Sequence, residues 1–148
     1  MSDTSFGEGK REVARLVDTT YDAVLRDFEP RRFPGPAVPC RSAGGAGPAT
    51  GEYLPAGSLV FDVPPREESK RYVAKVRDYW REQGFENVEV DPVGEIVNAQ
   101  KGSYRLTFNL TPRVGKATLG ASGPCAKPDG EDDREEPPQF RSLGDSAR

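Results

Sequence analysis

The chain has 148 residues, of which 34% are hydrophobic, and it contains 16 glycines and 14 prolines. This length allows one domain, and the low apolar content indicates that part of the chain lies in loops or in a tail. The formal net charge of -3 arises within residues 126–148, because the rest of the sequence carries equal numbers of acidic and basic residues. A neutral folded part gives no electrostatic signal for nucleic acid, so we expect no nucleic-acid partner.

The sequence contains no histidine. Its absence removes the commonest general base and the commonest metal ligand, and two cysteines alone cannot complete an ordinary structural zinc site. We assign the acidic pair Glu67/Glu68 to a helix N-terminus and Asp91, with Glu95 nearby, to a turn, rather than to acid–base catalysis. We therefore predict a protein that is not an enzyme, with no catalytic residues, no metal and no cofactor.

Two helices are predicted. Apolar residues recur at helical spacing over residues 13–28, Ser5 stands three residues before a glutamate as in a capping box, and Pro30 is expected to end this helix. The second helix covers roughly residues 67–83, and Gly84 follows it as a left-handed C-cap.

Strand patterns occupy most of the remaining chain. Residues 31–51 are predicted as a loop, because prolines and a glycine-rich run interrupt them. Phe108 belongs to a segment in which apolar and polar residues alternate, so its side chain is expected to point into the core. We predict the α+β class, with two helices packed on one face of a four- or five-stranded, mainly antiparallel sheet. The expected strands cover residues 58–63, 87–91, 95–100, 104–110 and 116–121.

The predicted domain covers residues 5–125, and residues 126–148 are predicted to form a disordered, charged tail with too few apolar groups to offset the entropy of ordering. Residues 1–10 lack the apolar segment of a signal peptide. We expect either that the protein is cytoplasmic or that an export segment lies upstream.

Cys40 and Cys125 are the only cysteines, each follows a proline, and together they enclose nearly all of the segment that is expected to fold. This placement predicts a disulfide between the front of the domain and its last strand, and thus an oxidising compartment. In the chain-entropy model, a bond across such a separation stabilises the fold by about 4.5 kcal/mol. The alternative is two unrelated buried thiols.

The second predicted helix also carries a basic ridge, formed by Lys70, Arg77 and Arg81, beside Trp80. Cationic side chains next to an indole suit an anionic envelope component or a membrane surface, so these four residues form our candidate binding site. The alternative is that the ridge is a solvated face paired with acidic neighbours, and that Trp80 belongs to the core.

The sequence resembles the soluble domains of small actinobacterial envelope lipoproteins. The resemblance rests on the order of four features: Trp80, Gly84 with Phe85, the strand over residues 104–110 and the closing segment 119–125. The resemblance covers roughly residues 21–125. It implies export, a lipid anchor upstream, a structural disulfide and no known enzymatic activity. The sequence departs from that pattern at its start, where the lipobox cysteine and the signal sequence are missing.

These observations favour a non-catalytic extracytoplasmic domain that serves as a binding or structural module of the cell envelope. The alternative function is a cytosolic regulatory or protein-interaction domain with free thiols. The redox state of the two cysteines separates these hypotheses.

Overall fold

The computed structural model describes residues 5–33, 38–42 and 47–127. Its helices are α1 (Phe6–Val24), the short 3-10 helix η2 (Glu67–Lys70) and α2 (Arg71–Glu82). Its strands are β1 (Pro30–Phe33), β2 (Val38–Arg41), β3 (Ala49–Leu54), β4 (Ala56–Asp62), β5 (Glu86–Val90), β6 (Ile96–Lys101), β7 (Tyr104–Thr111) and β8 (Lys116–Ser122).

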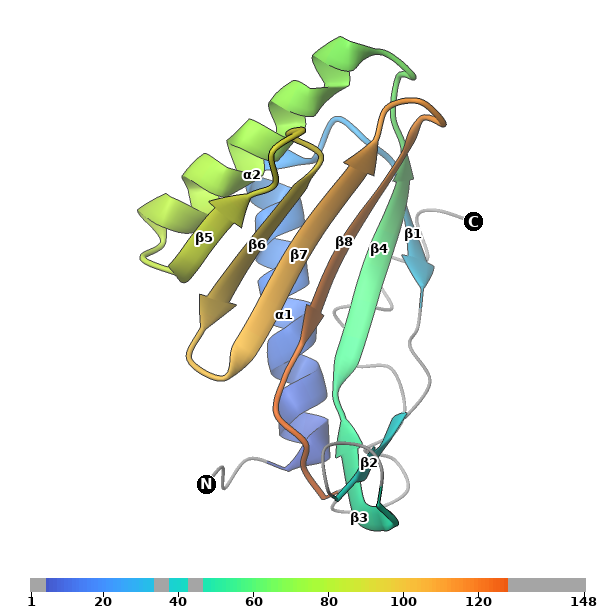
Figure 1. Cartoon of the computed structure of the whole chain (residues 1–148), viewed down its shortest axis with the longest axis vertical. Helices are drawn as coiled ribbons and strands as arrows, with labels where there is room; N and C mark the ends of the chain where they lie inside the picture. The colour runs from blue at the N-terminus through green and yellow to red at the C-terminus, as the bar shows by residue number, and fades with distance from the viewer. Residues whose placement is uncertain (1–4, 34–37, 43–46, 128–148) are drawn as a thin grey trace.

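The main sheet has six strands in the order β1-β4-β8-β7-β6-β5, and neighbouring strands pair antiparallel. Helix α1 packs against β4, β7 and β8, whereas α2 packs against β5, β6 and β7, so both helices cover the same face (Figure 1). Strands β2 and β3 form a separate two-stranded sheet near one end of α1. The predicted α+β class is confirmed.

The start of α1 matches its predicted capping box, but its end does not match the prediction. The hydroxyl of Ser5 accepts a hydrogen bond from the backbone N–H of Glu8, and the Glu8 carboxylate accepts one from the Ser5 N–H, both at 3.1 Å. The helix ends at Val24 rather than at Pro30, which instead begins β1. The chain leaves the helix early because Phe28 turns back to pack between Phe61 and Tyr72.

The predicted loop over residues 31–51 contains most of β1, all of β2 and the start of β3, so this prediction is wrong. Strand β1 adds an edge to the main sheet through β4, which raises the strand number from the predicted four or five to six. The missed strands are short, and Pro30 and Pro39 lie within them. Proline is tolerated in edge strands, where its missing N–H costs no ladder hydrogen bond.

The core lies between the helices and the inner face of the sheet. Phe108 is 0% exposed, as predicted, and Leu25, just after α1, is also 0% exposed. Thr107 is exposed on the outer face and donates a hydrogen bond to the side-chain oxygen of Asn98 at 2.7 Å. The largest fully buried side chains are those of Trp80, Phe6, Phe61, Phe108, Leu16, Leu25, Leu59, Leu106, Leu110, Leu119 and Val13.

The second predicted helix is divided into η2 and α2. Its predicted C-cap is confirmed, because Gly84 has a φ of 77° and the neighbouring Phe85 packs against the core. Neither helix in the described ranges combines the length and the apolar character needed to cross a membrane.

The last described residues are bonded to the domain. Ala126 exchanges two backbone hydrogen bonds with Tyr53, and the carbonyl of Lys127 accepts one from the Phe6 N–H at 3.0 Å. The ordered domain therefore extends two residues beyond the predicted boundary at residue 125. The remainder of the predicted disordered tail, residues 128–148, lies outside the described residues.

Candidate functional site

Cys40 and Cys125 form a disulfide, with 6.3 Å between their Cα atoms. Cys40 lies on β2, and Cys125 follows the end of β8 and is exposed. Next to the bond, Tyr53 on β3 pairs with Ala126. The disulfide thus fastens the β2–β3 hairpin to the end of the domain, which confirms the predicted pairing.

The three cations of the predicted basic ridge do not form one open surface. The Lys70 ammonium lies 2.8 Å from the Glu67 carboxylate and 3.8 Å from that of Glu95. Arg77 donates to the neighbouring Asp78 at 2.9 Å. Arg81 is exposed at the end of α2. Two of the three positive charges are therefore paired with carboxylates, as in the alternative of a solvated face.

Trp80 cannot supply an aromatic edge to this surface. Its side chain is 0% exposed, and its indole N–H donates a hydrogen bond to the Thr20 hydroxyl at 3.0 Å. Thr20 is also buried, so the bond links α2 to α1 inside the core. The prediction that Trp80 contributes to a binding surface is wrong, and the alternative that it is a core residue is confirmed.

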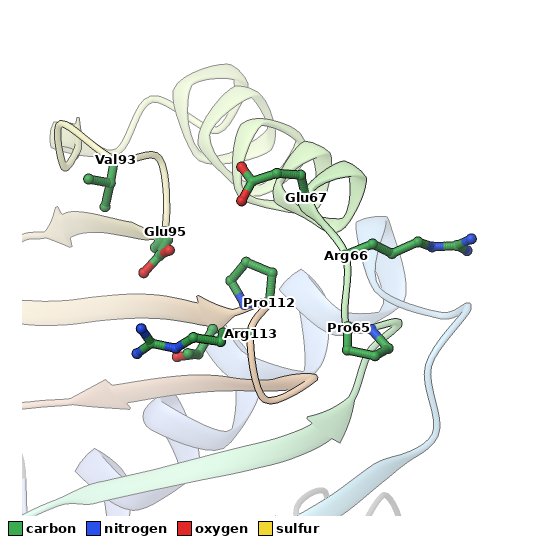
Figure 2. Close-up of a pocket in the computed structure, with 8 residues that line it drawn as sticks. Pro65, Arg66, Glu67, Val93, Glu95, Pro112 and Arg113 are labelled. Carbon is green, nitrogen blue, oxygen red and sulfur yellow. The ribbon is translucent and has the colours of Figure 1, made fainter.

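A cleft of about 500 Å³ lies at one end of the main sheet (Figure 2). Lys70 is beside it, because its ion-pair partners Glu67 and Glu95 line the cleft. We call this cleft the loop-end cleft. Three segments form it: the connection from β4 to η2, the β5–β6 turn and the β7–β8 turn. It is lined by Pro65, Arg66, Glu67, Val93, Glu95, Thr111, Pro112 and Arg113.

The charges of the loop-end cleft differ between its walls. Lys70 bridges the carboxylates of Glu67 and Glu95, and its pKa is raised, first by the hydrogen bond to Glu67. Arg66 points away from the cleft, towards solvent (Figure 2). Arg113 has no ion-pair partner among the described residues. The cleft thus has an acidic wall, in which one ammonium group offsets only one of two carboxylate charges, and one unpaired guanidinium.

Asp91 holds the β5–β6 turn that positions one wall of this cleft. One of its carboxylate oxygens accepts backbone hydrogen bonds from Glu95 at 2.7 Å and from Ile96 at 2.9 Å. These bonds, that from Ile96 foremost, lower the pKa of Asp91. The assignment of Asp91 to its turn is confirmed. At the tip of the same turn, Val93 is left 58% exposed.

Sequence reasoning missed the cleft because its residues are distant in the chain. It paired Glu67 with Glu68 and Asp91 with Glu95, whereas the fold brings Glu67 and Glu95 to the same ammonium group. Only the antiparallel return of β7 and β8 places Arg113 at this end of the sheet. No local motif marks it.

Across residues 5–33, 38–42 and 47–127, no three His, Cys, Asp or Glu side chains come together as a possible metal site. Comparisons of the chain with models of protein families, with curated proteins and with solved structures find no match.

Proposed function

We propose that this chain is a non-catalytic domain that works outside the cytoplasm, as a binding or structural module of the cell envelope. The disulfide between Cys40 and Cys125 is the observation that carries the proposal. Disulfides persist in oxidising compartments and are rare in the cytosol, where thiol reductants keep cysteines reduced. Because Cys125 is exposed, cytosolic reductants would have access to this bond.

Subcellular fractionation of the organism that encodes the chain tests the compartment. An antibody against the folded domain should detect the protein in the envelope or external fraction, and externally added protease should digest it in intact cells after removal of the wall. Recovery in the cytosolic fraction, protected from protease, would contradict the proposal. That result would favour the alternative of a cytosolic regulatory or protein-interaction domain with free thiols.

The partner that we propose is an anionic component of the envelope or the membrane surface. Exposed cations that have no ion-pair partner in the described part of the chain support this class, among them Arg81 on α2 and Arg113 at the loop-end cleft. Attraction between exposed charges extends over about 8–10 Å at physiological ionic strength, so such binding should weaken as salt is added.

Co-sedimentation with anionic lipid vesicles tests the α2 face. If this face binds the membrane surface, the double variant Arg77→Glu/Arg81→Glu should sediment less than the wild type. The charge-matched control Arg11→Glu/Arg26→Glu changes two exposed cations on and just after α1. Equal loss in both double variants would show a non-specific charge effect and would remove α2 as the binding face.

A further inference from the structure

The outer face of the main sheet is open in the described part of the chain. Both helices lie behind the strands in Figure 1, and no described helix or strand crosses in front of β5, β6, β7 or β8. On β7, the exposed side chains of Arg105, Thr107 and Asn109 alternate with buried leucine and phenylalanine. The polar side of β7 therefore faces outwards.

Two neighbouring hollows cross this face. One, of about 490 Å³, lies over β5, β6 and β7, and the other, of about 380 Å³, lies over β7, β8 and β4. Arg105 and Thr107 line both hollows, so their side chains lie between the two, and we call the two hollows together the outer trough. At the usual spacing between strands of about 4.8 Å, five strands give a trough roughly 19 Å across.

The hydrogen bonds on this face leave donors directed outwards. The side-chain oxygen of Asn98 accepts from Thr107, and that of Gln100 accepts from Asn87. The amide nitrogens of Asn98 and Gln100 therefore keep N–H groups for a ligand. The Arg105 guanidinium adds up to five N–H donors, and it has no hydrogen-bond or ion-pair partner in the described ranges. Such a surface complements a ligand rich in acceptors.

The charge and the shape of the trough favour binding of an anionic group of a ligand at the side formed by β8. Arg105 lies opposite Ser122 on β8. Glu89 lies two strands away on β5 and is in register with Thr107 rather than with Arg105, so more than roughly 9–10 Å separates its backbone from that of Arg105. Gly120 has no side chain and lies between Thr107 on β7 and Ser58 on β4. A Cβ atom there would be 3.4 Å from Ser58, so a larger side chain would occupy the hollow.

We propose that the outer trough binds an extended acidic polysaccharide, with a carboxylate of the ligand paired to Arg105 and sugar hydroxyls bonded to Asn98 and Gln100. This inference rests on the proposed function, for which it names the binding surface and the ligand class. A guanidinium binds a carboxylate in two parallel charge-assisted hydrogen bonds. The length of the trough suits a linear polymer, and its hydroxyl and amide groups suit the alternating donors and acceptors of sugars.

Titration calorimetry with tetragalacturonate tests this proposal, with its methyl ester as the uncharged ligand of the same skeleton. The wild type should bind the acid at least about tenfold more tightly than the ester. Arg105→Gln should weaken binding of the acid by a similar factor. Gly120→Val should weaken it by filling the floor of the trough, while valine suits a strand. Arg11→Gln, which changes an exposed cation on α1, should bind as the wild type does.

Thermal melting of each variant establishes that it is folded. Three results would each overturn the trough as the site. The folded Arg105→Gln variant could bind the acid as tightly as the wild type does, the wild type could bind acid and ester equally tightly, or the wild type could fail to bind the acid. Binding to anionic vesicles without binding to the acid would also overturn the trough as a polysaccharide site, and it would indicate that the ligand is the membrane surface. None of these outcomes changes the compartment, which fractionation tests separately, so the failure of this inference is distinguishable from that of the proposed function.

Discussion

Replacing Thr20 by valine should destabilise the fold through the indole of Trp80. The Thr20 hydroxyl accepts the indole N–H at 3.0 Å and donates to the carbonyl of Leu16 at 2.9 Å. Valine keeps the shape of threonine but offers no acceptor, so the N–H of a side chain with 0% exposure would lose its partner. A buried donor without a partner costs about 1–3 kcal/mol, and we expect a loss of about 2 kcal/mol.

Thr19 provides a matched control one residue earlier. Its hydroxyl also donates to the Leu16 carbonyl, at 3.2 Å, but its side chain is exposed and does not meet Trp80. Thr19→Val should therefore change stability by less than about 0.5 kcal/mol. Thr20→Ser restores the oxygen and should recover part of the loss.

Urea unfolding is the assay, followed by the fluorescence of Trp80, which is the only tryptophan of the chain. The free energy of unfolding is compared between variants at an unchanged denaturant slope. If Thr20→Val and Thr19→Val cost the same, or if Thr20→Val lies within about 0.5 kcal/mol of the wild type, the argument from the buried indole donor is refuted.

Three further predictions test other parts of the fold. Phe108→Ala should cost roughly 3–5 kcal/mol in urea unfolding and Thr107→Ala under 1 kcal/mol, and the reverse order would contradict the assigned faces of β7. The double variant Cys40→Ser/Cys125→Ser should lose up to about 4.5 kcal/mol of its free energy of unfolding, and an unchanged melting temperature would refute the contribution of the disulfide to stability. Burial, aided by a neighbouring aspartate, raises the pKa of Asp18 to about 7. Between about pH 4 and 7 the folded state therefore binds more protons than the unfolded state. The free energy of unfolding consequently falls as pH rises through this window. Asp18→Asn should thus be more stable than the wild type at pH 8, by about 1 kcal/mol because the group is partly exposed, and alike at pH 4; equal stability at both pH values would contradict this reasoning.

Local patterns were sufficient to detect both helices and the central strands, but not to locate the end of α1 or the division between η2 and α2. The capping box at Ser5 and the glycine cap at Gly84 act within a few residues, so the sequence marks them directly. The alternation over β7 likewise identified the buried face that contains Phe108. The two caps depend only on residues that are close in the chain. The alternation arises because successive side chains of a strand point to opposite faces of the sheet, and only one of these faces is buried.

Strands β1, β2 and β3 could not be found in this way. Strand β1 has four residues and begins at Pro30, and its identity comes from pairing with β4. Pro39 within β2 pairs with Tyr53 on β3. Such pairing is a tertiary effect that a proline-rich local pattern conceals.

The candidate site shows the same limit. Lys70 was placed on the ridge by α-helical spacing, but it is the last residue of the 3-10 helix η2, in which side chains three residues apart lie one above the other. The Lys70 ammonium is consequently directed to Glu67 and Glu95. The trough around Arg105 depends on the order of β5, β6, β7, β8 and β4, which no single segment specifies.

The redox state of Cys40 and Cys125 in the cell tests the central claim most directly. Cells of the organism that encodes the chain are quenched in acid, free thiols are alkylated in denaturant, and the mass of the intact chain is measured without reductant. An extracytoplasmic domain should carry no alkyl groups and should gain two only after reduction. Two alkyl groups on the unreduced chain would contradict the account.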